Sequence, residues 1–387
     1  MPTYVQGTRA TTDLVSQNRK YSLDAKLWRL DPEAAKVAFF ARKLNKKSVS
    51  DPEFSWFEKE QPSRYDAVNG AIADGTTTSI VVDDGTKFRA GDVVQVVSTG
   101  EQMLVTAVSG NTLTVTRGWG DTAGAAIADN AVVVIIGNAH AEGATTRDAL
   151  TTKPERKYNY TQIFREPFDV TETNAATELF VGGNDINNLR LEHLEVHLKD
   201  IERSFLFGEP KEDTSGAKPR RATGGLNYWI NTHVTSVSGG TLTESEWDSF
   251  VREVFSTGGD KKMAFMSPLI ASAVESWAKT KLNLYPKDKT YGIAIRNYIS
   301  IHGSIDFVVE KLLAENSTWA GMAFFVDLER IGYRYLSANG KNRDTRLLKD
   351  RQANDEDSIR EEYLSEIGFW LANENRHGVL KGVTDYS

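Results

Sequence analysis

The chain contains no cysteine among its 387 residues. This absence excludes disulfide bridges, thiolate catalysis and zinc sites built on cysteine. Long apolar runs are also missing, since no stretch approaches the roughly 18 residues that cross a bilayer. The polar N-terminus "MPTYVQGTRATTDLVSQNRKYS" carries no apolar signal core. We therefore expect a soluble protein that makes no use of a membrane and is not exported by a cleaved signal.

A basic excess is absent as well. The chain has 53 acidic and 46 basic side chains, for a net charge of −7. Proteins that grip nucleic acid usually show a basic balance or a concentrated basic face. Tight DNA binding is therefore not expected.

The sequence also lacks a phosphate-binding G-x-x-x-x-G-K-[ST] loop, a G-x-G-x-x-G turn after a strand and a G-x-S-x-G nucleophile elbow. We expect no enzyme and no cofactor.

What the chain does contain is a change of character at residues 70–138. Charged residues thin out there, and short runs of Val, Thr and Ile follow one another in series. Thr99-Gly100 and Ser109-Gly110-Asn111 separate some of these runs and suit tight hairpins. The pattern predicts a small antiparallel barrel or sandwich inserted into the chain. The strand-like "YNYTQIFREPFDV" after it would be the returning arm of a long hairpin that leaves the body near residue 58.

A long amphipathic helix is predicted at 184–207, and it carries His193 and His197 four residues apart. Two histidines at this spacing can bind a metal, but a closed site needs further ligands. The zinc-protease order is His-Glu-x-x-His, whereas Glu195 here stands one residue too late and turns away from the histidines. The histidine pair is therefore a weak metal candidate, and a structural helix is the favoured interpretation.

The spacing of the leucines supports that interpretation. Residues repeating at intervals of 3, 4, 3 and 4 form an apolar stripe, which predicts one buried face flanked by the two histidines: Leu191, Leu194, Leu198, Ile201 and Phe205. Leu189 and Val196 form a second, weaker apolar patch. On a helical wheel, Glu202 falls on the side that carries the charged residues. A helix that needs cover on two sides is either central to its domain or covered by a neighbouring subunit.

The rest of the chain divides around this helix. Asp31 and Pro32 are typical of a helix start in the N-terminal region. Residues 241–340 alternate helices and strands, with Thr243 and Glu246 spaced as a capping box.

Two charged segments have more than one interpretation. Arg220 and Arg221, with Lys218, form either a binding patch, for phosphate or for an acidic partner, or a solvated loop. The charge run from residue 341 predicts a solvated or ion-paired face, followed by a long terminal strand that pairs back onto an earlier sheet.

Five stretches in order resemble one protein family: "FSWFEKE", "YNYTQIFREPFDVT", "LEVHLKDIERSFLFG", "ATGGLNYWI" and "SANGKNRDTRLLKDRQANDEDSIREEYLSEIGFWLANEN". They span most of the chain from about residue 54 to 375. They resemble the major capsid proteins of tailed bacteriophages, which have the Hong Kong 97 fold. Trp56 and Trp229 lie within these stretches and join the stripe residues and the two arginines as structural or interface candidates.

The resemblance implies an α+β capsid fold with a small all-β insertion domain. Its parts would be an N-terminal arm (1–57), an extended loop (58–172) that carries the insert (about 70–138), a peripheral domain (173–240) with its spine helix (about 184–207), an axial domain (241–340) and a return to the peripheral domain (341–387). The β insert is an addition to the minimal family plan.

The implied function is self-assembly into hexamers and pentamers of an icosahedral head that encloses double-stranded DNA without sequence-specific binding. Implied partners are scaffold and portal proteins and a minor or decoration capsid protein, with assembly in the host cytoplasm and residence in the virion. Three other classes stay open at this point. They are an encapsulin-like nanocompartment shell, another virion protein of the tail or baseplate, and a metal hydrolase built on the histidine pair.

Overall fold

The computed structural model describes residues 35–177, 185–281, 285–286 and 296–386. The described residues form two compact units, one reaching up to Trp56 and resuming at Lys157, and the other spanning Phe57–Arg156. The predicted helix start at Asp31 and Pro32 lies outside the described residues. Among the helices of the described part, none is long and apolar enough to cross a membrane.

The first sheet of the larger unit is built around a long C-terminal strand. Its order is β1 (Lys46–Val49), β20 (Ile331–Ala338), β23 (Ser358–Leu371) and β10 (Gln162–Thr171). β1 runs parallel to β20, whereas β23 is antiparallel to both of its neighbours. The short strands β21 (Lys341–Asn342) and β22 (Arg346–Leu348) pair with β20 and β23. The predicted return of the terminal strand to an earlier sheet is therefore confirmed.

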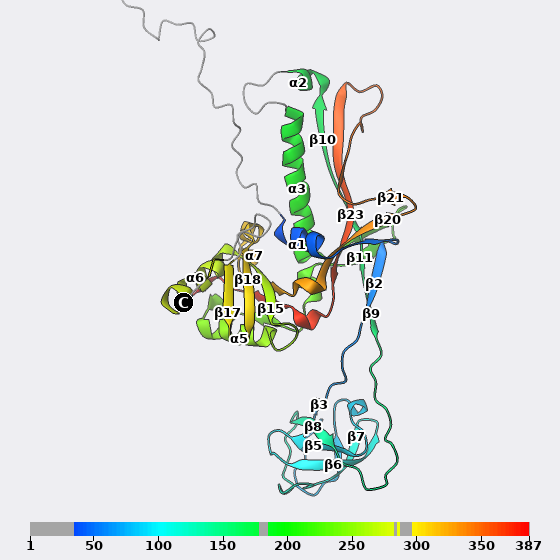
Figure 1. Cartoon of the computed structure of the whole chain (residues 1–387), viewed down its shortest axis with the longest axis vertical. Helices are drawn as coiled ribbons and strands as arrows, with labels where there is room; N and C mark the ends of the chain where they lie inside the picture. The colour runs from blue at the N-terminus through cyan, green and yellow to red at the C-terminus, as the bar shows by residue number, and fades with distance from the viewer. Residues whose placement is uncertain (1–34, 178–184, 282–284, 287–295, 387) are drawn as a thin grey trace, which may run out of the picture. The chain divides into compact units, whose positions relative to one another are not determined.

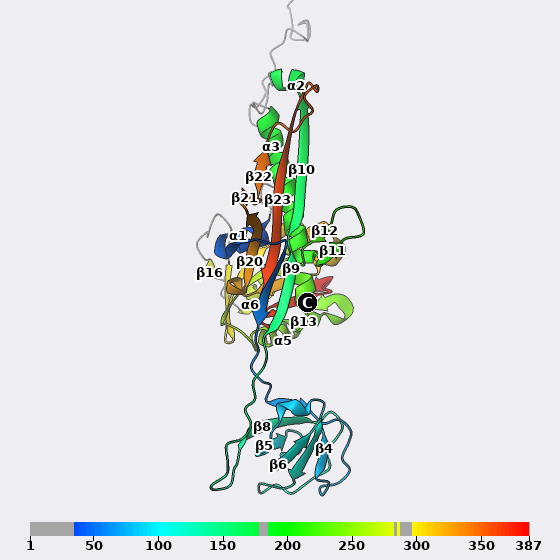
Figure 2. The same ribbon diagram turned by 90° about the vertical axis from the view of Figure 1, so that its right-hand side faces the viewer.

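A long helix lies against this sheet. Helix α3 (Asp185–Phe207) runs alongside β10 and β23 in both views (Figures 1 and 2). It matches the helix predicted at 184–207 to within one residue. Helix α1 (Lys36–Leu44) packs against α3 and β20. Along β10, side chains alternate between the buried face towards α3 and the opposite exposed face, as the two-residue period of a strand requires.

The second sheet belongs to the α/β part of the same unit. Its strands, in spatial order, are β13 (Val234–Ser236), β24 (Gly378–Lys381), β19 (Ala323–Val326), β15 (Lys261–Met266), β18 (Gly303–Val309), β17 (Arg296–Ser300) and β16 (Tyr285–Pro286). Along β15, Met263 and Phe265 join the core that contains α3, while Ala264 and Met266 join the core of α5 and α6. Both faces of this sheet are therefore buried.

Two helices cover one face of the second sheet. Helix α5 (Glu244–Val254) begins with the predicted capping box, in which Thr243 and Glu246 hydrogen-bond each other's backbone N–H groups. It ends at Val254, and Gly258 takes a φ of 90° in the turn that leads to β15. Helix α6 (Pro268–Lys281) begins at a proline, the residue most suited to the first position of a helix.

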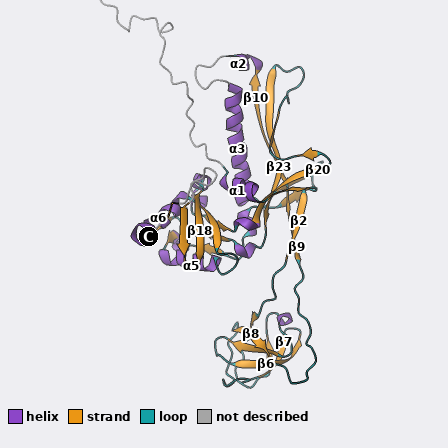
Figure 3. Cartoon of the chain, in the orientation of Figure 1, coloured by secondary structure: helices purple, strands orange, loops and turns teal. Residues whose placement is uncertain are grey.

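The smaller unit is a six-stranded antiparallel sheet, shown in orange in Figure 3. Its order is β3 (Tyr65–Ala67), β8 (Val132–Asn138), β5 (Asp92–Val96), β6 (Gln102–Ser109), β7 (Thr112–Thr116) and β4 (Ser79–Val81). A bridge between Val68 and Val82 joins its two ends, so the sheet curls around its own valine-rich core. Gly100 and Gly110 have positive φ in the predicted hairpin turns. The small all-β insert is confirmed.

Short elements complete the chain. β2 (Glu53–Glu58) pairs with β9 (Glu155–Tyr160) where the chain leaves for the insert and returns. The others are α2 (Glu172–Ala176), α4 (Leu226–Trp229), α7 (Ser317–Ala320), β11 (Lys211–Asp213), β12 (Arg220–Ala222), β14 (Thr241–Leu242), β25 (Asp385–Tyr386) and the 3₁₀ helices Gly85–Lys87, Ser238–Gly240, Lys311–Glu315, Leu328–Arg330 and Glu374–Arg376.

Candidate functional site: the long helix, its sheet and the charged face

The buried line of α3 does not follow the predicted leucine stripe. His193, His197, Ile201 and Phe205, each four residues after the last, face the sheet and the core, and the last three of them are fully buried. Residues spaced by four form a row inclined to the helix axis. Leu191, by contrast, is 54% exposed. The predicted buried stripe is therefore wrong at its N-terminal end, because the contact line crosses the helix obliquely.

The remaining stripe residues lie between these extremes. Leu194 and Leu198 are half-buried, and Leu198 packs against the edge of the core. Val196, from the second apolar patch, is exposed together with Leu191. A single copy of the chain therefore leaves apolar side chains of α3 in contact with water.

His197 belongs to the interior of the subunit. Only 1% of its surface is exposed, and its Nε2 lies 2.7 Å from Ser365 Oγ on β23. Its ring also contacts Phe164 and Tyr363. Burial lowers the pKa of His197 below its ordinary value of 6.5, because the charged imidazolium loses its hydration. This side chain is a neutral packing residue that also fixes α3 to β23.

His193 has different partners. Its ring stacks on Phe168 with 5.1 Å between centroids, and its Nδ1 lies 2.7 Å from Glu166 Oε1 on β10. Across the described residues, no group of three or more histidine, aspartate or glutamate side chains gathers in a way that could hold a metal ion. The two histidines of the weak metal pair are each engaged separately with the sheet.

Glu202 is buried, although the helical wheel placed it on the polar arc. Its two carboxylate oxygens accept the backbone N–H groups of Val37 and Ala38, at 2.7 and 2.8 Å, at the start of α1. Burial and the charge of Glu310 raise the pKa of Glu202 to about 8, against the opposing effect of the hydrogen bonds and Lys36. Sequence patterns carry no signal for this contact, because α1 and α3 are far apart in the chain.

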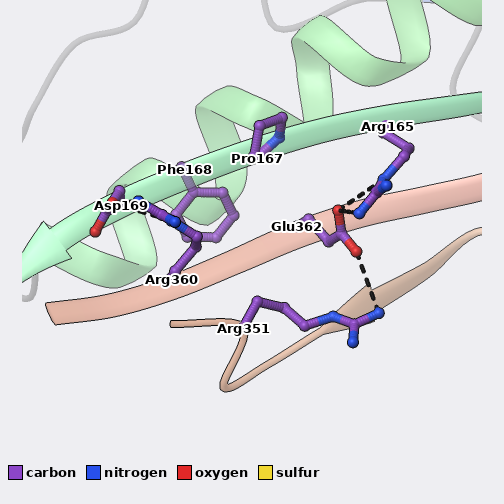
Figure 4. Close-up of a pocket in the computed structure, with 7 residues that line it drawn as sticks. All are labelled: Arg165, Pro167, Phe168, Asp169, Arg351, Arg360 and Glu362. Atoms are coloured by element: carbon purple, nitrogen blue, oxygen red, sulfur yellow. Dashed lines mark hydrogen bonds and ion pairs between the residues drawn. The ribbon is translucent and has the colours of Figure 1, made fainter. Parts of the chain in front are cut away.

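The face of β10 and β23 that points away from α3 carries charge. Arg165 and Arg351 both reach Glu362 from opposite sides, at 2.5 and 3.3 Å, and Arg360 pairs with Asp169 at 2.5 Å. Figure 4 shows these side chains around an open hollow of about 700 Å³. The predicted charge run is thus ion-paired at these positions.

The two arginines after α3 lie in a small hairpin. Arg221 pairs with Glu212 across β11 and β12, at 2.7 Å, while Arg220 is exposed at the other end of β12. The structure therefore ties Arg221 into the hairpin and does not bring the two guanidinium groups to one shared partner.

An aromatic cluster brings together the two predicted tryptophans. The Trp56 ring lies 5.9 Å from that of Trp229 and 6.3 Å from that of Trp370 on β23, in edge-to-face arrangements. The Arg334 guanidinium stacks over Trp370 at 4.5 Å. Trp56 and Trp229 therefore pack within their own subunit.

Inside the insert, one buried ion pair organises a loop. Arg117 donates two hydrogen bonds to the Glu101 carboxylate, both at 2.7 Å, and Glu101 also accepts the backbone N–H groups of Gly118 and Ala125. Burial alone would raise the pKa of Glu101, but these hydrogen bonds outweigh it and lower the pKa. Trp119, within this loop, is 48% exposed.

The fold as a whole has counterparts among solved structures. The chain resembles the capsid of an empty GTA particle with a TM-score of 0.51 and 10% identity, covering 97% of this chain and 98% of that one. It resembles a chain of Microbacterium phage Oxtober96 with a TM-score of 0.51 and 9% identity, covering 96% and 98%. These similarities show the fold of the chain, which is an α+β fold of the Hong Kong 97 type.

The sequence comparison is more specific. The family model described as SU10 major capsid protein matches residues 4–384. The major capsid protein of Pseudomonas phage PaMx41 is 24% identical over 284 residues, which cover 70% of this chain and 67% of the relative. The chain belongs to the SU10 major capsid protein family. It is a structural phage capsid protein of the virion that assembles into shells, and it is not an enzyme. The metal-hydrolase alternative is not favoured.

Proposed function

We propose that copies of this chain form hexamers and pentamers, which close an icosahedral head around double-stranded DNA. Assembly takes place in the host cytoplasm with a scaffold protein, a portal protein and a minor or decoration protein as partners. Membership of a major capsid protein family supports this proposal. The net charge of −7 also suits a wall that contains DNA without binding it tightly.

The parts of the subunit follow from the same proposal. Residues 1–57 act as an arm and 58–172 as an extended loop with the insert at about 70–138. Residues 173–240 and 341–387 form the peripheral domain around α3, and residues 241–340 form the axial domain. We assign the exposed side of α3, rather than its buried line, to contact with a neighbouring subunit.

The observation that carries this proposal is the apolar surface that a single copy leaves in water. Leu191 and Val196 are exposed on α3, and Ile299 is exposed on β17. Ile301, in the turn between β17 and β18, is 97% exposed. We assign these exposed apolar side chains of α3 and of the β17–β18 turn to surfaces that a neighbouring copy covers. Contacts between copies would bury them.

Electron microscopy of the protein expressed alone tests this proposal directly. Closed shells with five-fold vertices, and heads from infected cells whose DNA resists nuclease, are the expected results. Rings, tubes or shells that exclude DNA in infected cells would contradict it.

A matched pair of variants tests the assigned surface on α3. Leu191→Asp places a charge at an interface and should abolish or strongly reduce shell formation, whereas Leu191→Met keeps an apolar side chain and should assemble. Circular dichroism verifies that both subunits remain folded. Equal sedimentation of the two variants as shells would remove Leu191 from any subunit contact.

The insert has a separate proposed role as a clamp or host-facing decoration on the outer surface. Because β3 pairs with β8, its removal requires excision from residue 65 to 138 with a short turn in its place. Shells of the deleted protein should disassemble at a lower temperature than native shells. Unchanged thermal stability of the shells would exclude the role of the insert as a clamp and leave its role as a decoration of the outer surface.

A further inference from the structure

The open hollow on β10 and β23 is lined by more cations than anions. Arg165, Arg351 and Arg360 line it together with Asp169 and Glu362 (Figure 4), and we call it the arginine hollow. The three arginine side chains are 59%, 49% and 43% exposed, so their guanidinium groups face water as well as their carboxylate partners. A guanidinium group has five N–H donors, and two of these arginines share Glu362. The arginine hollow can therefore accept an anion from outside.

An acidic turn lies directly before β23, at the end of the strand that carries Arg360. It consists of Asp355, Glu356 and Asp357, and all three residues are exposed. Glu356 makes a 3.5 Å contact with Arg360 of its own chain. Within the described residues, the side chains of Asp355 and Asp357 have no ionic or hydrogen-bonding partner. Like charges on adjacent residues repel one another, so a cationic partner would stabilise the acidic turn.

We propose that the acidic turn of one copy docks into the arginine hollow of a neighbouring copy. The chain carries both surfaces, and their opposite charges make them complementary between copies. The inference rests on the proposed assembly of copies into a closed head and names one contact within it. Because the acidic turn and the arginine hollow are different surfaces, the contact is heterologous, and such contacts close into a ring when the rotation between copies allows it.

Duplex DNA fits the arginine hollow less well than a second copy does. Asp169 and Glu362 lie inside the hollow, and the acidic turn lies close to Arg360. A phosphate backbone would meet these carboxylates together with the arginines, and an excess of one cation offsets little of its charge. A short turn can instead place single carboxylate oxygens against guanidinium groups in charge-assisted hydrogen bonds.

Cross-linking between chains with one cysteine each tests the contact, since the native chain has none. One chain carries Pro167→Cys in the lining of the hollow, and the other carries Asn354→Cys beside the acidic turn, so all charges are retained. The two chains are assembled together into shells and treated with a short bismaleimide. Any covalent product then joins two copies. In the control, Ala217→Cys, at an exposed position between β11 and β12, replaces Asn354→Cys.

We expect dimers between the Pro167→Cys and Asn354→Cys chains to form at least tenfold faster than dimers with the Ala217→Cys chain. Peptide mass mapping identifies the joined residues. Shells that form without such dimers would overturn the inference and leave the proposed assembly intact, which separates the two. Dimers of Asn354→Cys chains alone would show that acidic turns meet each other, and would also overturn it.

Charge reversal serves as a second test if the cysteine chains do not assemble. The variant Asp355→Lys, Asp357→Lys changes exposed side chains only, so the subunit should fold, which circular dichroism verifies. Expressed alone, it should give at least tenfold fewer shells than the native chain. The control Asp121→Lys, Glu142→Lys makes the same change in net charge at exposed positions of the insert and should assemble like the native chain. Equal shell yields from the two variants would overturn the inference.

Discussion

The carboxyl group of Glu202, in the last third of a 23-residue helix, accepts the backbone N–H of Val37 at 2.7 Å and so joins α3 to the first turn of α1. A helix N-terminus leaves its first N–H groups without helical partners, and here a distant glutamate satisfies two of them. The contact fixes the start of the described chain to the spine helix.

This contact predicts a pH dependence. The folded-state pKa of Glu202 is raised from 4.5 to about 8 by burial and Glu310. The folded protein therefore holds a proton that the unfolded chain releases between these values, so stability is present below pH 4.5 and is lost as the pH rises towards 8. Glu202→Gln, which cannot ionise, should flatten the fall in melting temperature of the free subunit between pH 5 and 8. The exposed Glu315→Gln is the control, and an unchanged slope in Glu202→Gln would contradict the assignment.

The buried ring of His197 predicts that the subunit loses stability as the pH falls, the opposite of the dependence expected from Glu202. Its folded-state pKa is lowered below 6.5 by burial, with Asp200 and Glu166 acting in the other direction. The unfolded chain binds more protons below pH 6.5, so the stability contributed by the neutral ring is lost as the pH falls through the folded-state pKa. The melting temperature of His197→Gln should fall less between pH 7.5 and 5 than that of the native subunit. His302→Gln, at an exposed turn, should have the same melting temperatures as the native subunit over this pH range. A change as large as that of His197→Gln would contradict the role assigned to His197.

Gly225 packs so closely against the end of α3 that no larger residue fits there. A Cβ at this position would lie 2.6 Å from the carbonyl oxygens of both Ser204 and Phe205, and these backbone atoms cannot move aside without disturbing the helix. Gly225→Ala should destabilise the subunit by about 1–3 kcal/mol, the usual range for overpacking. Chemical denaturation measures the loss. Gly216→Ala, where the added Cβ meets nothing closer than 3.8 Å, should stay within experimental error of the native protein.

The buried pair in the insert predicts a local effect. Arg117→Leu leaves Glu101 buried without its guanidinium partner, and breaking such a pair costs about 3–5 kcal/mol. We expect the insert to become sensitive to protease within Phe57–Arg156 at temperatures where the rest of the chain resists. Lys87→Leu removes a more exposed partner, that of Asp66, and should have a smaller effect. Equal protease sensitivity in the two variants would mean that the Glu101–Arg117 pair does not hold the loop.

Much of the architecture could be read from local patterns. Helix α3, the capping box at Thr243, the β insert and the terminal strand all depend on the order of nearby residues, because hydrophobic period, caps and turn glycines act over a few positions. The resemblance to phage capsid proteins depended on the order of several stretches, and the family match supports it.

The orientation of α3 could not be read in the same way. The spacing of the leucines indicated a stripe along the axis, yet the sheet contacts an oblique row that includes His193 and His197. Which row is buried depends on the direction in which β10 and β23 cross the helix, and these strands are distant in sequence. Leu191 is consequently exposed, and a leucine in water is a candidate for a contact between subunits.

The amino-acid order alone determined that this is a cysteine-free, acidic chain with a long helix, a β insert and no recognisable catalytic motif. Tertiary structure alone decided that Glu202 caps a helix that begins some 165 residues earlier in the chain, and that His193 and His197 contact different residues of the sheet. The reason is physical: composition and period are local quantities, whereas burial and hydrogen-bond partners depend on which distant elements the folded chain places side by side.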